Sequence, residues 1–179
     1  MSTLTPLPPL DLVPVWEQAL SYESFVAAAS EDHRPLWEAI GRTHAPSEAS
    51  LELRLPEGSR LLVIAEDWCG DAVNVIPALH NWAVATGVEM RLIERDLWPR
   101  VMDRYLTGDA RAIPIVIILG RDGNEIGHWG PRPAEIQAWD VAHRRTMEKA
   151  ERYKEVRRWY ARDRGASTIR EVVAAAAPR

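Results

Sequence analysis

The sequence contains a single cysteine, Cys69, among its 179 residues. One cysteine excludes a disulfide within the chain, and with it the class of small secreted proteins that disulfides hold together. Apolar runs long enough to span a membrane are also missing. The proline-rich segment 1–15 lacks the basic stretch followed by an apolar one that marks a secretory signal peptide. These absences predict a cytoplasmic protein that does not associate with membranes.

Sequence features of metal, phosphate and nucleic-acid sites are absent as well. The five histidines have no metal-ligand spacing, and the chain has no glycine-rich phosphate loop. A net charge of −4 disfavours a nucleic-acid surface. We therefore expect no metal, no cofactor and no nucleic-acid partner. The hydrophobic (46%) and charged (27%) fractions that are present are typical of a soluble globular domain large enough to bury a core.

Hydrophobic periodicity predicts helices and strands that alternate through the middle of the chain. Helices are expected at about 14–20, 22–29, 35–44, 69–86, 99–106, 133–164 and 168–177, and strands at 60–65, 88–94, 115–119 and 125–129. This order predicts an α/β fold with a mixed central sheet flanked by helices. We assign 1–50 to an N-terminal helical extension, 51–145 to the core, and 146–179 to a C-terminal helical extension that contains the end of the long helix.

Cys69 lies where a buried strand gives way to the longest helix of the core. At such a turn the backbone N–H groups point outward and the helix dipole favours an anion, so a thiol there can ionise near neutral pH. The neighbouring acids Glu66, Asp67 and Asp71 would have the opposite effect and raise the pKa of the thiol. The alternative is a cysteine that only packs in the core, because free cysteine is among the most buried residue types.

Several short motifs resemble those of thioredoxins. The run from Trp68 to Ala72 resembles the thioredoxin active site Trp-Cys-Gly-Pro-Cys, with Ala72 in place of the second cysteine. The chain is most similar to a branch of thioredoxin-like bacterial proteins that share five motifs with it, here 66–71, 95–96, 105–107, 113–114 and 129–133. The resemblance covers roughly residues 20–140 and implies a thioredoxin-like fold. The usual first strand of that fold is expected to be replaced by the N-terminal helices or to lie within 51–55.

The resemblance also implies a site around Cys69. Pro114 is expected to be the cis-proline that faces the cysteine, and the backbone of Ile113 would pair with an extended substrate. Substrate contacts are further expected from the motif residues, which are Trp68, Gly70, Asp71, Trp129 and Arg132. Trp68 and Trp129 would wall a groove, and Arg132 would hold a carboxylate such as that of a thiol peptide. The alternatives are a trans proline, a tryptophan at 129 that fills the core, and an ion pair of Arg132 with Asp67 or Asp71.

Two departures from thioredoxin leave the activity open. Ala72 removes the resolving thiol, and Val63 stands where thioredoxins carry a buried acid that accepts a proton. Asp67 is either a substitute for that acid or a solvated surface residue. One hypothesis is a monothiol oxidoreductase that acts on a protein disulfide or a low-molecular-weight thiol. An external thiol would then release the mixed disulfide, or Cys69 would be oxidised by peroxide and reduced again by an external partner. The other is a redox-inactive binding module.

The charged segment 144–164 begins at the end of the core and continues into the C-terminal extension. Its pattern is typical of a solvated helix face with ion pairs between residues four apart. The tryptophan and tyrosine within it also suggest a homodimer contact through the C-terminal helix.

Overall fold

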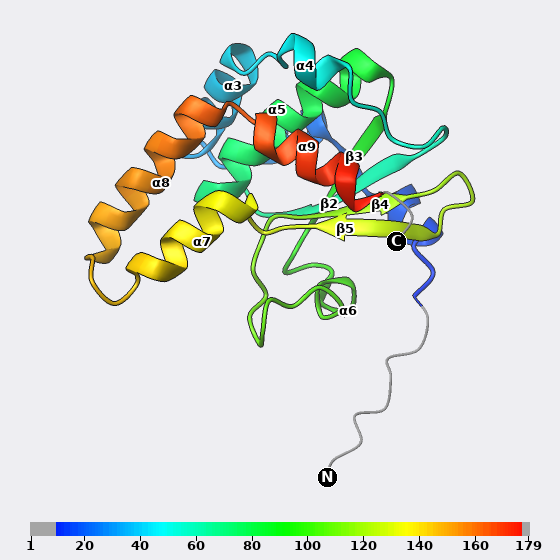
Figure 1. Cartoon of the computed structure of the whole chain (residues 1–179). Coiled ribbons are helices and arrows are strands. Elements are labelled where there is room, and N and C mark those ends of the chain that lie inside the picture. Colours follow the sequence, from blue (N-terminus) through cyan, green and yellow to red (C-terminus); the bar gives the residue numbers. More distant parts are fainter. Residues whose placement is uncertain (1–9, 177–179) are drawn as a thin grey trace.

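The computed structural model describes residues 10–176, and a five-stranded sheet forms its centre (Figure 1). The strand order is β1-β3-β2-β4-β5, with bounds Leu20–Ser21 (β1), Arg60–Ala65 (β2), Glu89–Glu94 (β3), Ile115–Leu119 (β4) and Glu125–Trp129 (β5). β2 and β3 are parallel, and the other three pairings are antiparallel. The expected mixed sheet flanked by helices is confirmed.

The two central strands explain why the sheet forms where it does. β4 is buried along its whole length, and β2 is buried from Leu61 to Ala65, because both are continuous runs of apolar residues. Such runs are typical of strands that are covered on both faces. Val63 lies between Leu92 of β3 and Val116 of β4 in the register of the sheet. The position that holds an acid in thioredoxins is therefore part of the hydrocarbon core.

Nine helices occur in the described part of the chain. They are α1 (Val13–Gln18), α2 (Tyr22–Ala28), α3 (Arg34–Thr43), α4 (Glu48–Leu51), α5 (Gly70–Thr86), α6 (Pro99–Met102), α7 (Ala134–His143), α8 (Lys149–Asp163) and α9 (Ala166–Ala175). In Figure 1, α3, α4, α5 and α9 lie on one side of the sheet, and α6 lies on the other. The predicted end of α5 is confirmed, since Gly87 caps it in the left-handed region with φ of 74°. Within residues 10–176, no helix combines the length and the apolarity that a membrane crossing requires.

The first strand differs from the expectation. It is β1, a two-residue strand that pairs Leu20 with Leu92, and it is neither replaced by helices nor located in 51–55. The first helix ends at Gln18 because Ala19 is already extended, with ψ of 145°. Residues 51–55 form no strand, and the short helix α4 ends at Leu51, in the stretch 47–51 where the sequence allows a helical turn. The parts of our assignments that fall on residues 1–9 and 177–179 lie outside the described residues.

The expected continuous helix from 133 to 164 is wrong, because the chain forms two helices that fold back on each other. The helices α7 and α8 meet in a turn over 144–148, with Glu148 extended at the start of α8 (Figure 1). The buried carboxylate of Asp140 on α7 accepts hydrogen bonds from Arg144 in the turn and Arg152 on α8. The boundary that we set after residue 145 therefore lies inside this turn.

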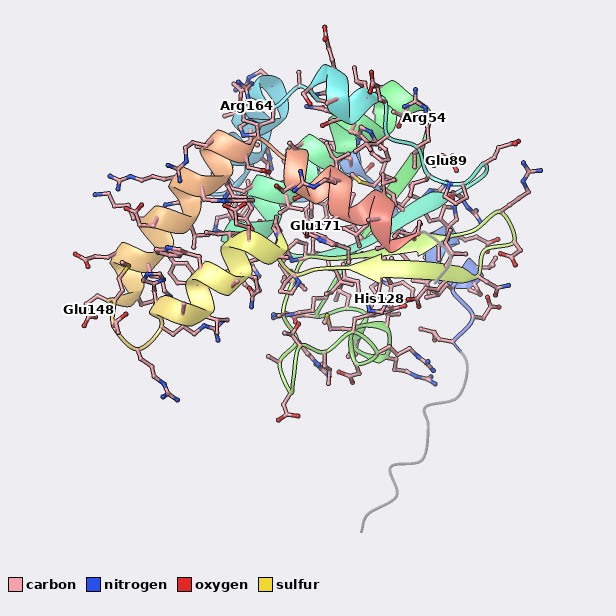
Figure 2. All side chains as sticks on the ribbon, in the orientation of Figure 1. Arg54, Glu89, His128, Glu148, Arg164 and Glu171 are labelled. Carbon is pink, nitrogen blue, oxygen red and sulfur yellow. The ribbon has the colours of Figure 1, made fainter. Side chains whose placement is uncertain are left out.

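The C-terminal helices are fastened to the rest of the molecule at both ends. Arg164, which follows α8, donates to the carbonyl oxygen of Thr43 at the end of α3 (Figure 2). Glu171 of α9 accepts a hydrogen bond at 2.7 Å from the indole nitrogen of Trp129 on β5. The extension is thus tied to α3 through Arg164 and to the end of β5 through Glu171.

Candidate functional site

Cys69 is the N-cap residue of α5 and points toward the loop that precedes β4. Its sulfur lies 3.5 Å from the backbone nitrogen of Ala72, which donates to it, and 3.5 Å from the carbonyl oxygen of Ile113. The side chain is only 8% exposed. Cys69 therefore lies at a strand-to-helix turn, as predicted, but its sulfur is largely enclosed.

Ile113 and Pro114 lie directly beside this sulfur, and the peptide bond between them is cis. The Gly130–Pro131 bond, which the sequence analysis did not single out, is cis as well. Gly130 has φ of 136°, and a Cβ atom there would collide with the carbonyl oxygen of Pro114. The segment that follows β5 is thereby held against the proline loop, and Pro131 and Arg132 line the same cavity as Cys69.

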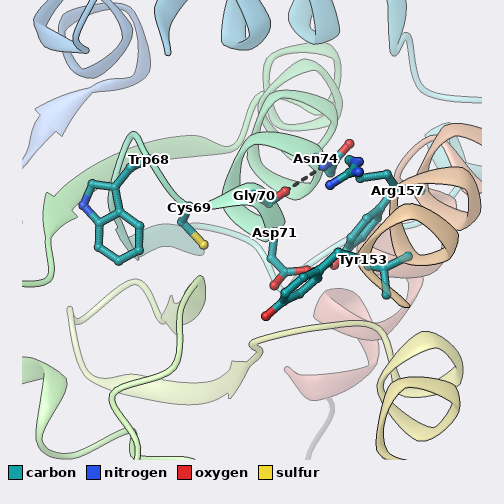
Figure 3. A pocket seen from close by; sticks show the side chains of 9 residues that line it. Trp68, Cys69, Gly70, Asp71, Asn74, Tyr153 and Arg157 are labelled. Carbon is teal, nitrogen blue, oxygen red and sulfur yellow. Dashed lines mark hydrogen bonds between the residues drawn. The ribbon is translucent and has the colours of Figure 1, made fainter. Parts of the chain in front are cut away.

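Two cavities meet at Cys69. One has a volume of about 330 Å³ and lies between the start of α5 and the face of α8 (Figure 3). The other, of about 530 Å³, lies between Cys69, the loop before Pro114 and the turn between α7 and α8. Trp68, Cys69, Asp71 and Tyr153 line both. In Figure 3 the sulfur lies between Trp68 on one side and Asp71 with Tyr153 on the other.

Arg132 forms an ion pair with Asp71, which is one of the two alternatives that the sequence left open for it. Its Nε lies 2.8 Å from the Asp71 carboxylate, and its Nη1 lies 3.0 Å from that of Asp140. Asp71 also accepts a hydrogen bond at 2.9 Å from the hydroxyl of Tyr160 on α8. Burial alone would lower the pKa of Arg132, but the two carboxylates outweigh it and raise the pKa. A role for Arg132 in holding a substrate carboxylate stays a prediction.

The electrostatic influences on the thiol oppose one another. Burial is the largest and raises the pKa of Cys69, and the charge of Asp71 acts in the same direction. The backbone N–H of Ala72 and the guanidinium of Arg132 lower it, but by less. The sequence left two opposing effects on this thiol open, and the net effect is a raised pKa, because desolvation outweighs the helix N-terminus.

Asp67 is not a substitute for the missing proton acceptor. Its carboxylate accepts hydrogen bonds from the backbone N–H of Ser30 at 2.8 Å and from the ring of His33 at 3.1 Å. Burial alone would raise the pKa of Asp67, but these two partners outweigh it and lower the pKa. Neither cavity at Cys69 has Asp67 among its lining residues. Its role is to fix the N-terminal helices, which neither of our two interpretations anticipated.

Glu66 is the buried acid of this region. Its carboxylate accepts a hydrogen bond at 2.9 Å from the backbone N–H of Asp96. Burial raises the pKa of Glu66, and that hydrogen bond only partly opposes the effect. Glu66 thus connects the end of β2 to the loop that follows β3.

The two tryptophans expected to wall the groove, Trp68 and Trp129, differ in their exposure to solvent. Trp68 is 50% exposed, and the guanidinium of Arg95 lies 5.0 Å from the centre of its ring. Trp129 is buried and is not among the residues lining either cavity at Cys69. The structure therefore places Trp129 in the core, which was the alternative interpretation. Gly70 begins α5 at the mouth of the smaller cavity, and a Cβ atom there would meet nothing within 4 Å.

The sequence analysis missed the contribution of α8 and of the arginines. Tyr153, Val156 and Tyr160 of α8 face the smaller cavity, and their spacing of three and four residues is a helical signal that could have identified a buried face. Arginines 95, 111, 144 and 152 line the larger cavity. No sequence signal distinguished them from solvated charges. Among residues 10–176, no cluster of three or more histidine, cysteine or acidic residues could hold a metal ion.

Comparison with known proteins identifies the family. The thioredoxin family model Thioredoxin_9 matches residues 19–154, which is more than half of the chain. The chain belongs to this thioredoxin family. Of the three described helices beyond β5, the match includes α7 and the start of α8, so part of the C-terminal extension lies within the family model.

Two solved structures share the thioredoxin-like fold with this chain. A protein of unknown function from Pseudomonas aeruginosa is similar with a TM-score of 0.75 at 19% sequence identity, over 93% of this chain and 96% of that one. An HIV epitope scaffold is similar with a TM-score of 0.71 at 18% identity, over 92% of this chain and 96% of that one. At these identities the likeness shows the fold alone. No curated protein matches the chain.

Proposed function

We propose that the protein is a monothiol thiol–disulfide oxidoreductase in which Cys69 is the reacting group and an external thiol completes the cycle. The observation that carries this proposal is the position of the sulfur on the wall that two cavities share, next to the carbonyl of Ile113. A small molecule that enters the larger cavity would bring its own sulfur against Cys69. The absence of a second cysteine then decides how the intermediate is resolved.

The exchange proceeds in two balanced steps. The Cys69 thiolate attacks one sulfur of a disulfide RS–SR′, forms the mixed disulfide with RS, and releases R′S⁻, which takes up a proton. A second thiol, R″SH, then attacks the mixed disulfide, leaves as RS–SR″, and restores the Cys69 thiol. One disulfide is consumed and one is formed, so no oxidant or reductant is required beyond these thiols.

The raised pKa of Cys69 has a direct consequence for the rate. Only the thiolate attacks, so the rate follows the ionised fraction and continues to rise with pH beyond the ordinary thiol value of about 8.5. A cationic group that approaches Cys69 would increase the ionised fraction of the thiol. A substrate that displaces water from the cavity would do the same, because the charge of Arg132 would then be less screened. The site is therefore slow with a bare reagent and depends on the substrate that fills the cavity.

A second candidate is supported by the same burial. A thiol that is 8% exposed and has a raised pKa suits a redox-inactive module that binds a partner at the groove beside Pro114. In that case Cys69 contributes packing and its hydrogen bond, and its reactivity is incidental.

Mixed-disulfide formation separates the two candidates. The protein is incubated with a small symmetric disulfide across a range of pH, and the adduct is followed by intact mass, with Cys69→Ser as the variant that cannot react. We expect an adduct that forms in the wild type, whose rate rises with pH, and that a second thiol removes again. An adduct that does not form at any pH, or that thiol cannot remove, contradicts the oxidoreductase and supports the binding module.

The assembly and location of the protein are also proposals. We propose a homodimer through the C-terminal helix and a cytoplasmic location, on the sequence features given above. Within the chain, Tyr160 bonds to Asp71, and the indole nitrogen of Trp159 donates to Glu135 at 2.9 Å. A dimer would therefore use other parts of α8. Light scattering after gel filtration tests it, and a mass of 20.2 kDa at all concentrations would contradict it.

A further inference from the structure

The larger cavity at Cys69 has an unusual lining of arginine. Of its sixteen lining residues, five are arginines and two are acids; the arginines are Arg95, Arg111, Arg132, Arg144 and Arg152, and the acids are Asp71 and Asp140. Cys69 and Ile113 belong to the same lining. The cavity thus combines a sulfur on one part of its wall with an excess of guanidinium groups on another.

Asp140 is the centre of this arrangement. It is 2% exposed, and its carboxylate contacts three guanidinium groups, those of Arg132 at 3.0 Å, Arg144 at 3.1 Å and Arg152 at 2.6 Å. One carboxylate cannot neutralise three arginines. Asp71 balances a second positive charge through Arg132, so this group keeps a net positive charge beside the cavity.

The remaining two arginines have partners of their own. Arg95 binds Asp96 through two nitrogens, and Arg111 binds Asp103 in the same way. Neither aspartate is among the residues that line the cavity. These two guanidinium groups therefore line the cavity while their carboxylates do not, and the net positive charge comes from the group around Asp140.

Donor groups remain available for a ligand. In the described chain, Nη2 of Arg132 and Nη2 of Arg152 have no hydrogen-bond partner, and neither is sealed from solvent. Guanidinium groups bind carboxylate, sulfonate and phosphate through paired N–H donors, and partial burial strengthens such bonds. A volume of about 530 Å³ suits a small molecule.

We infer that the arginine-lined cavity binds the anionic end of a low-molecular-weight thiol or its disulfide, whose sulfur then lies against Cys69. This inference rests on the proposed function and names its substrate class: a small thiol compound that carries a carboxylate, sulfonate or phosphate group. The arginines select the substrate by charge, and they hold the disulfide beside the sulfur of Cys69.

Three symmetric disulfides of similar size test the selection: dithiodipropionate, which is anionic, hydroxyethyl disulfide, which is neutral, and cystamine, which is cationic. The rate of adduct formation at Cys69 is divided by the rate of each reagent with a free small thiol. We expect the anionic reagent to exceed the neutral one by about tenfold, as one charge-assisted hydrogen bond would give, and the cationic one to be slowest. Raising the salt concentration should reduce the difference.

Matched variants locate the effect. Arg144→Gln and Arg111→Gln should each lower the preference for the anion a few-fold, because their side chains are 54% and 45% exposed and contribute less than a buried charge. Arg121→Gln is the control, since Arg121 pairs with Glu57 at 2.6 Å and does not line this cavity. The Arg121→Gln variant should prefer the anionic disulfide over the neutral one as strongly as the wild type does. A preference that Arg121→Gln lowers as much as the two cavity variants do would overturn the inference.

An unreactive ligand separates the failure of this inference from the failure of the proposed function. Methylthiopropionate and its neutral alcohol analogue are titrated into Cys69→Ser, and amide chemical shifts report binding. Saturable shifts around the cavity with the anion alone support the inference. Equal adduct rates for all three disulfides without anion binding would overturn it while leaving the oxidoreductase intact. No adduct with any disulfide overturns the oxidoreductase, and the titration then decides whether the cavity binds anions.

Discussion

The two aspartates that flank Cys69 are held by opposite ends of the chain. Asp67, two residues before the cysteine, accepts hydrogen bonds from Ser30 and His33 of the N-terminal segment. Asp71, two residues after it, accepts them from Tyr160 of the C-terminal segment and from Arg132. The two residues carry the same charge at the same distance in sequence. Asp71 lines both cavities at the thiol and raises the pKa of Cys69, whereas Asp67 lines neither cavity.

This difference shows that sequence proximity to a cysteine does not give an acid a role in its chemistry. The direction in which each side chain leaves the turn decides that role. Asp67 turns toward the helices before the sheet and fixes them, whereas Asp71 turns toward α8 and remains in the wall of both cavities. We therefore expect substitutions at Asp67 to change stability, and substitutions at Asp71 to change the reactivity of Cys69.

The largest expected effect concerns Asp140, which supports the Asp71 side through Arg132. Asp140→Asn removes the carboxylate that three guanidinium groups share. Arg132 keeps Asp71, but the buried Arg152 is left without a carboxylate, and we expect the free energy of unfolding to fall by about 3–5 kcal/mol at neutral pH. Denaturant titration measures the change. The control is Asp109→Asn at an exposed position, which should change stability little.

The same variant has a predictable pH dependence. Burial alone would raise the pKa of Asp140, but the arginines outweigh it and lower the pKa below the ordinary value of about 3.9. The stabilisation by Asp140 is therefore present above that ordinary value and is lost as pH falls through the lowered pKa of the folded state. The stability curves of wild type and Asp140→Asn should converge at low pH, and a difference that persists there would contradict the assignment.

A smaller effect is expected on the Asp67 side. Asp67→Asn removes the charge that Ser30 and His33 contact, and we expect a loss of about 1 kcal/mol in the free energy of unfolding. The alkylation rate of Cys69 should not change, because Asp67 lies outside the cavities. A clear change in that rate would remove the distinction between the two sides of the turn.

The smallest effect concerns the thiol itself. Asp71→Asn removes a negative charge that raises the pKa of Cys69, so the pKa should fall and alkylation by iodoacetamide at fixed pH should become a few-fold faster. Asp67→Asn is the matched control, because it removes the same charge at the same sequence distance. Equal rates in the two variants would show that Asp71 does not act on the thiol.

Local sequence was sufficient to predict the centre of the fold. The apolar runs 61–65 and 115–119 form β2 and β4, and Gly87 ends α5 as expected. These features depend on neighbouring residues alone, as does the placement of Cys69 at the start of a helix. The resemblance to thioredoxins further implied that Pro114 would face Cys69, and the carbonyl oxygen of the preceding residue, Ile113, lies 3.5 Å from the sulfur.

Features that depend on distant contacts could not be predicted in this way. β1 is two residues long and exists because Leu20 pairs with Leu92. The break between α7 and α8 contains neither glycine nor proline. Arg144 and Arg152, which meet at Asp140, belong to a segment with the pattern of a solvated helix face. The pKa of Cys69 likewise depends on enclosure by α8 and the proline loop, which no local pattern reveals.

Gly130 sets a limit on how this protein can vary. Its backbone lies in a region open almost only to glycine, and a side chain would strike the carbonyl oxygen of Pro114. Any side chain at this position must therefore push the segment after β5, which carries Arg132, away from the loop that contains Pro114. Evolutionary drift and laboratory libraries should both retain glycine at this position, while Gly70, with free space around it, should accept alanine.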